Sequence, residues 1–128
     1  MKKIALLIMT LMVIGLIGFY KVKADSETFS LTMGTVQYFY SEPRRFVEGN
    51  FFVEMTFDRW YNSSCNSGQV KVALHQRGSS RALGSIQRNI NMYSTLYHIF
   101  GYFDNTEKYY EFERLSCGWR SNMVRIGS

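Results

Sequence analysis

The chain has 128 residues, of which 46% are apolar, 16% aromatic and 20% charged, and it contains 10 glycines, 1 proline and 2 cysteines. This composition excludes collagen-like chains, disordered chains and disulfide-dense small scaffolds, and the length suits one small globular domain. The formal net charge of the whole chain is +5.

Residues 1–24 have the features of a secretory signal peptide. Lysines near the start precede an uncharged, mostly apolar run over 4–19, and Ala24 ends the segment. A basic front, an apolar stretch and a small residue at the end are typical of a leader, so we expect cleavage after Ala24. The alternative is an uncleaved membrane anchor, because the apolar run is just short of a full span. Both alternatives export residues 25–128, either as a secreted domain or as one anchored outside the cell.

Loss of the leader removes most of the net charge. Four of the 15 basic residues lie within 1–24 and all 10 acidic residues follow it, so the exported part has 11 basic groups and a net charge of +1. Nucleic-acid binding needs clustered Lys and Arg side chains that meet several phosphates. The basic doublet of the exported part, Arg44-Arg45, falls in an expected loop, and we therefore predict no nucleic-acid partner.

The exported part alternates apolar and polar residues with the period of β-strands. The alternation over 28–40 slips at Gly34, which predicts one bulged strand or two strands that meet at a bend. The clearest strand has Phe51, Val53, Met55 and Phe57 on one face. Further strands are expected over 70–75, 82–86, 92–103, 109–115 and, as a short edge or final strand, 123–126.

These segments are separated by turns rich in Gly, Asn and Ser. Helical spacing is poor after the leader, except over 81–98, where Gly84 and Asn89 weaken the helical alternative. About seven short strands at this spacing predict an all-β fold, and specifically an antiparallel β-sandwich. A small β-barrel is the alternative.

Cys65 and Cys117 both lie in the exported part. An even count of cysteines in an oxidising compartment predicts one structural disulfide. A redox role is disfavoured because no Cys-x-x-Cys is present, and a zinc site because His75 and His98 show no ligand spacing to either cysteine. We expect neither a metal nor a cofactor.

The predicted disulfide also gathers four candidate binding residues. Arg59 and Trp60 end the clearest strand shortly before the first cysteine, and Trp119 and Arg120 follow the second. A disulfide brings its two flanking segments to one end of the molecule. Aromatic rings and guanidinium groups there would suit a protein, glycan or lipid partner. In the favoured alternative, one tryptophan packs in the core and arginine covers its edge.

Motifs for catalysis are missing from the sequence: it has no glycine-rich phosphate loop, nucleophile elbow, zinc-protease helix or calcium loop. A small secreted hydrolase would need a histidine, His75 or His98, beside a glutamate. The candidate glutamates are Glu54, Glu111 and Glu113. Glu111 and Glu113 share one face of a strand, which suits a carboxylate pair and equally the solvated side of a sheet.

Tyrosines occur in close pairs along the exported part. The pairs are Tyr38/Tyr40, Tyr93/Tyr97 and Tyr109/Tyr110. Their apolar rings and polar tips suit a binding face, or aromatic ladders that stabilise the sheet, which is the favoured alternative.

Together these patterns predict a secreted, non-enzymatic β-sandwich that binds an extracellular or cell-surface partner through loops bearing aromatic and arginine side chains. One alternative is a secreted toxin or antimicrobial protein that contacts membranes. Others are an immunity protein against such a toxin and, less favoured, the small hydrolase.

Overall fold

The computed structural model describes residues 25–128, and the predicted leader lies outside the described residues. Its eight strands are β1 (Ser26–Met33), β2 (Tyr38–Tyr40), β3 (Gly49–Trp60), β4 (Gln69–Gln76), β5 (Ala82–Asn89), β6 (Thr95–Phe103), β7 (Lys108–Arg114) and β8 (Trp119–Gly127). Over this described part, no helix is long and apolar enough to cross a membrane.

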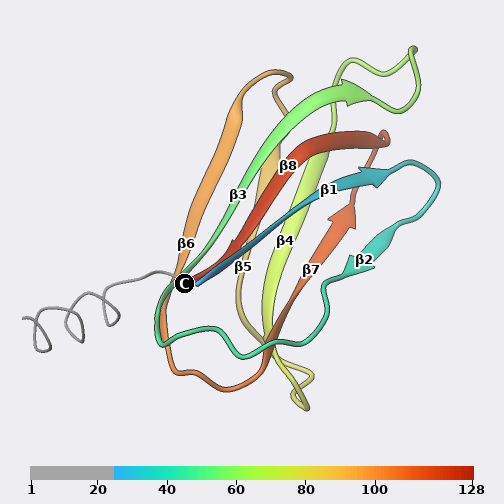
Figure 1. Ribbon diagram of the computed structural model, residues 1–128. Helices are drawn as coiled ribbons and strands as arrows, with labels where there is room; N and C mark the ends of the chain where they lie inside the picture. Colours follow the sequence, from blue (N-terminus) through green and yellow to red (C-terminus); the bar gives the residue numbers. More distant parts are fainter. Residues whose placement is uncertain (1–24) are drawn as a thin grey trace, which may run out of the picture.

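The strands form two antiparallel sheets of four strands each, in the orders β1-β8-β3-β6 and β2-β7-β4-β5. Figure 1 shows the two sheets as separate layers. The predicted antiparallel β-sandwich is therefore confirmed, and the barrel alternative is wrong. The helical alternative over 81–98 is also wrong, because 82–89 pairs with β4 along its length and the chain resumes as β6 at Thr95.

The slip in alternation at Gly34 marks a crossing between the two sheets. Residues before it form β1 in one sheet and residues after it form β2 in the other, so the two-strand alternative holds. A Cβ at Gly34 would lie 2.6 Å from the ring of Tyr61. The Tyr61 ring therefore covers this bend only because residue 34 has no side chain.

The last strand differs from the expected short edge. β8 has nine residues and lies between β1 and β3. Periodicity missed its first half because Ser121 is buried there in an inward position. The Ser121 hydroxyl donates to the carbonyls of Thr56 (2.9 Å) and Met123 (2.7 Å), which compensates for burying a polar group.

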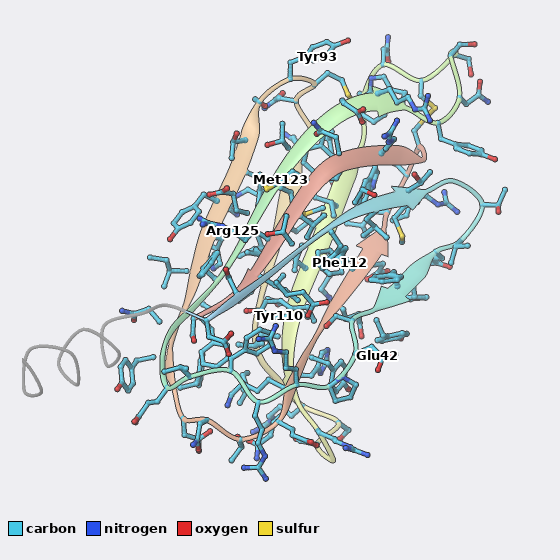
Figure 2. All side chains as sticks on the ribbon, in the orientation of Figure 1. Glu42, Tyr93, Tyr110, Phe112, Met123 and Arg125 are labelled. Atoms are coloured by element: carbon cyan, nitrogen blue, oxygen red, sulfur yellow. A yellow bond between two sulfur atoms is a disulfide. The ribbon has the colours of Figure 1, made fainter. Side chains whose placement is uncertain are left out.

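The core lies between the sheets and is rich in aromatic rings. Its fully or nearly fully buried members are Leu31, Met33, Phe46, Phe51, Val53, Met55, Phe57, Val70, Val72, Leu74, Ile86, Ile90, Tyr110, Phe112, Trp119, Val124 and Ile126. Figure 2 shows Tyr110 and Phe112 on β7 among these packed side chains. The Tyr110 hydroxyl donates across the sandwich to the carbonyls of Phe52 (2.9 Å) and Gly127 (3.2 Å).

The predicted disulfide is confirmed. Cys65 and Cys117 are bonded, with Cα atoms 6.0 Å apart, and they are separated by 52 positions in sequence. The bond joins the loop between β3 and β4 to the turn between β7 and β8, and each of these connections crosses from one sheet to the other. We call this the disulfide end of the sandwich; it consists of the connections 34–37, 61–68, 90–94 and 115–118.

Candidate binding surface

The four residues predicted from the cysteine flanks do come together. In the antiparallel register of β3 and β8, Arg59 lies opposite Arg120 and Trp60 lies opposite Trp119. Pairing of the two strands, rather than the disulfide alone, produces this arrangement.

The two tryptophans have different environments. Trp119 is fully buried and packs edge-on against Phe57, with ring centroids 5.2 Å apart. It is therefore a core residue, and the prediction of Trp119 as a contact residue is corrected: a ligand would have to displace the core to reach its ring. Trp60 is half-buried and its ring lies over Gly68, where an added Cβ would be 2.9 Å from the ring. The structure therefore agrees with the favoured alternative, in which one of the two tryptophans packs in the core.

The two arginines are accessible at the same end. Arg59 is exposed, and Arg120 is half-buried with its guanidinium 3.6 Å from the Asp58 carboxylate. Like charges directly opposite each other on paired strands repel, and Asp58 offsets that repulsion. A ligand-contacting role for Arg59, Trp60 and Arg120 stays a prediction.

A second surface combines aromatic rings with carboxylates on the outer side of the β2-β7-β4-β5 sheet. Because side chains alternate along a strand, the neighbours of the inward-facing Phe39, Tyr110 and Phe112 point outward. We call this surface the tyrosine face. Its residues are Tyr38 and Tyr40 on β2, Tyr109, Glu111 and Glu113 on β7, and His75 on β4.

Strand register places these side chains in rows across the sheet. Tyr38 lies opposite Glu113 and Tyr40 lies opposite Glu111, while Tyr109 lies opposite His75. The rings form a connected chain: the Tyr38 and Tyr40 centroids are 6.4 Å apart, those of Tyr40 and Tyr109 are 6.3 Å apart, and those of Tyr109 and His75 are 5.0 Å apart. Tyr38 and Tyr40 have 42% and 54% of their surface exposed.

The tyrosine hydroxyls lie close enough to the glutamates for the negative charges to affect their pKa. The Tyr38 hydroxyl donates to Glu113 Oε1 at 3.4 Å, and the negative charge of Glu113 raises the pKa of Tyr38. Partial burial, followed by the charge of Glu111, raises the pKa of Tyr40. Both phenols therefore stay protonated near neutral pH and act as hydrogen-bond donors as well as acceptors.

His75 is the buried polar group of the tyrosine face. Its ring stacks on Tyr109 with planes 9° apart, and Nε2 lies 3.3 Å from Glu111 Oε2. Neither ring nitrogen makes a hydrogen bond with any residue of 25–128. Buried polar atoms normally have partners, and the approach of Glu111 Oε2 to Nε2 is the polar contact that the structure gives this ring. The histidine–glutamate pair required by the hydrolase alternative is thus present, on a sheet face.

The other predicted acid–base candidates lie elsewhere. His98 on β6 packs edge-on against Phe100, with ring centroids 4.9 Å apart. Glu54 belongs to the outer side of the opposite sheet, where its carboxylate is 3.2 Å from the Arg125 guanidinium. The structure therefore separates His98 and Glu54 from Glu111 and Glu113.

A pocket of about 240 Å³ opens at the seam where β5, at the edge of one sheet, meets β6, at the edge of the other. Phe57 and Leu96 contribute its apolar wall, and Arg88, Asn91 and Ser94 contribute polar groups. We call it the seam pocket. The sequence did not predict this pocket because its two sides come from β5 and β6, which become neighbours only when the two sheets pack together.

Comparison with known proteins identifies similar folds but no relative. No protein family and no curated protein matches the chain. The C-terminal CBM6 of the Zobellia galactanivorans laminarinase LamC shares 13% identity with a TM-score of 0.51, over 81% of this chain and 100% of that one. A carbohydrate-binding module of Cellvibrio mixtus lichenase 5A, solved with cellotriose, shares 14% identity with a TM-score of 0.46, over 84% and 90% of the two chains.

The neighbours also include an adhesin domain. The cleaved adhesin domain of the Porphyromonas gingivalis Lys-gingipain has 11% identity and a TM-score of 0.49, over 79% of this chain and 74% of that one. At these identities, the likeness to the laminarinase module establishes the β-sandwich fold alone. Fold does not imply function, so a ligand has to be argued from the surface itself.

Proposed function

We propose that residues 25–128 form a non-enzymatic binding module for a glycan outside the cell, and that the tyrosine face is its ligand surface. One observation carries the proposal: the chain of tyrosine and histidine rings on this face stands directly beside two carboxylates. Resemblance of the fold to a carbohydrate-binding module supports the choice of a glycan over a protein or a lipid.

The chemistry of the tyrosine face suits a sugar. Sugars have apolar C–H surfaces bordered by hydroxyl groups, and tyrosine has an apolar ring with a polar tip. Glu111 and Glu113 are acceptors for sugar hydroxyls, and hydrogen bonds to a charged acceptor are about twice as strong as neutral ones. The surface is held by paired strands, so little ordering is needed when a ligand binds.

Exposed tyrosines allow a direct test of the proposal. Retention of the oxidised domain by insoluble cellulose, β-glucan, chitin and peptidoglycan is measured in pull-downs. We expect retention by at least one of them, and binding at least about tenfold weaker for Tyr40→Ala. Tyr102→Ala is the matched control, because Tyr102 is also exposed but lies on β6 in the opposite sheet.

Two outcomes contradict the proposal. One is that no polysaccharide retains the domain; the other is that Tyr102→Ala weakens binding as much as Tyr40→Ala. The same incubations test the hydrolase alternative, for which the 3.3 Å approach of His75 to Glu111 is the specific support. Release of soluble reducing sugar that stops in Glu111→Gln would establish that alternative instead.

A further inference from the structure

The seam pocket contains a cationic group without an anionic partner. Arg88 lies opposite the buried Val70 in the β4–β5 register, so its side chain starts from the inner side of an edge strand, and the residue is exposed where it lines the pocket. None of the ion pairs within residues 25–128 includes Arg88, whose guanidinium donates only to the carbonyl of Gln87, at 3.2 Å. No Asp or Glu lines this pocket.

The positive charge of Arg88 affects the pKa of a neighbouring histidine, His98. Burial lowers the pKa of His98, and the nearby positive charge of Arg88 lowers it further. His98 belongs to β6, on the other side of the seam. Arg88 on β5 and His98 on β6 therefore lie near each other across the seam between the two sheets.

On the polar side of the seam pocket, the side-chain amide of Asn91 is the group available to a ligand. Asn91 and Ser94 belong to the tight turn between β5 and β6, which is closed by the Ser94 N–H to the Asn91 carbonyl (3.3 Å) and by the Ser94 hydroxyl to the same carbonyl (2.6 Å). Within residues 25–128 the side-chain amide of Asn91 takes part in no hydrogen bond of the structure. An amide offers two donor hydrogens and a carbonyl acceptor, which match a sugar diol.

The same turn holds a strained aromatic residue. Tyr93 has φ of 62°, the left-handed region that non-glycine residues seldom occupy, and 84% of its surface is exposed. Its N–H donates to the Phe57 carbonyl at 2.8 Å, which ties the turn to β3. Figure 2 shows Tyr93 projecting at the end of the sandwich. Such strain persists where the surroundings enforce it, and it concentrates at ligand sites.

We propose that the seam pocket binds a carboxylate-bearing sugar, with Arg88 meeting the carboxylate, Asn91 meeting ring hydroxyls and Tyr93, on the same turn as Asn91, offering its exposed ring to the sugar. The inference rests on the proposed glycan function and narrows the ligand to an acidic glycan. Arginine suits this role because its planar guanidinium can hold a carboxylate through two parallel hydrogen bonds. The tyrosine face would contact neighbouring sugar units of a longer chain.

The test is an NMR titration of the oxidised domain with glucuronate and with N-acetylneuraminate, using glucose as the neutral control. The chain has 2 histidines, so the imidazole signals of His98 and His75 serve as the near and distant reporters. We expect a saturable shift of His98 with at least one acidic sugar, none with glucose, and little change at His75. Because the bound carboxylate offsets the charge of Arg88, the pKa of His98 should also rise towards its ordinary value.

Three variants complete the titration. Arg88→Gln should weaken binding of the acidic sugar about 10- to 100-fold, the range for loss of a charge-assisted hydrogen bond. Arg81→Gln removes the same charge from an exposed position just before β5 and should bind normally. Tyr93→Gly should relieve the strained φ, keep or raise the melting temperature and weaken binding, which separates a ligand role from a folding role.

The absence of a saturable His98 shift with either acidic sugar, equal binding of glucose, or an Arg81→Gln effect equal to that of Arg88→Gln would each overturn the inference. If polysaccharide retention through Tyr40 persists in that case, the proposed function stands and only the acidic ligand fails. If retention fails as well, both proposals fall.

Discussion

Tyr110 shows how one hydroxyl contributes to the stability of the whole sandwich. It reaches from β7 to the carbonyls of Phe52 and Gly127, which are register partners on β3 and β8. Tyr110→Phe keeps the ring but leaves these acceptors without that donor, so the free energy of unfolding should fall by about 1 to 3 kcal/mol. Urea denaturation measures the change, and an unchanged midpoint would contradict this role.

The same hydroxyl predicts an alkaline limit to stability. Burial raises the pKa of Tyr110 above its ordinary value of 10.0. A phenol whose pKa is higher in the folded state contributes fully below the unfolded-state pKa, and its contribution is lost as the pH rises above it. The free energy of unfolding should therefore fall above about pH 10, more steeply in the native protein than in Tyr110→Phe. Parallel curves for the two proteins would exclude Tyr110 as the cause.

Lys108 is a buried cation that organises the turn before β7. Its Nζ lies 2.7 Å from the Asp104 carbonyl and 2.9 Å from Asp104 Oδ1, and it also contacts the carbonyl (3.1 Å) and hydroxyl (3.0 Å) of Thr106. The ammonium also sits 4.8 Å from the centroid of the Phe51 ring. These oxygens compensate for burial of the charge.

Acid should loosen this turn. Hydrogen bonds from the Thr106 side chain, then from Lys108, hold the pKa of Asp104 well below its usual range. A carboxylate with a lowered folded-state pKa stabilises the fold above the unfolded-state pKa, and this stabilisation is lost as the pH falls. The acid-side loss of stability below about pH 4 should therefore be shallower in Lys108→Met than in the native protein. Thermal melts followed by circular dichroism across that pH range test this prediction. An identical dependence of stability on pH in the two proteins would show that the Lys108–Asp104 pair does not cause the loss.

At the scale of elements, alternation predicted which segments are strands but not which strands pair. The tracts that became β3, β4 and β7 were expected close to their observed positions, since each has one apolar face and one polar face. The exposed Tyr38 and Tyr40 were visible as a pair, yet their place beside Glu111 and Glu113 depends on pairing of β2 with β7. That pairing spans more than 70 positions, and local periodicity carries no information about it.

The candidate residues at the disulfide end illustrate the same limit. The sequence predicted correctly that Arg59, Trp60, Trp119 and Arg120 gather, because they flank the two cysteines. It did not predict which tryptophan is buried, because that depends on the side of each strand that faces inward after the bulges in the β3–β8 register. The seam pocket depends on two edge strands meeting, which no single segment encodes.

The contribution of the disulfide to the free energy of unfolding can be predicted from the loop that it closes. It joins two connections between the sheets across a loop of 52 positions. The chain-entropy estimate for a loop of this size is about 4 kcal/mol. The Cys65→Ala/Cys117→Ala double variant should lose about this much free energy of unfolding, measured by urea denaturation against the oxidised protein. A loss well below about 2 kcal/mol would show that the sandwich holds its two sheets together without the bond.

As we propose it, the whole molecule is a rigid β-sandwich with two ligand surfaces. The tyrosine face lies across one sheet, and the seam pocket lies at the disulfide end where the edges of both sheets meet. A glycan that contacts both would gain affinity from two linked sites on one rigid body. Membrane attack, the toxin alternative, requires no such arrangement, and dye release from liposomes by the purified domain would support it.

The most direct test is to map the ligand on the domain by NMR, using soluble fragments of a polysaccharide that retains it in pull-downs. The account predicts backbone shift changes concentrated at Tyr38, Tyr40, Tyr109 and Glu111, with smaller changes around Arg88. Changes confined to the outer side of the β1-β8-β3-β6 sheet, or to the paired ends of β3 and β8 at Arg59 and Arg120, would contradict it.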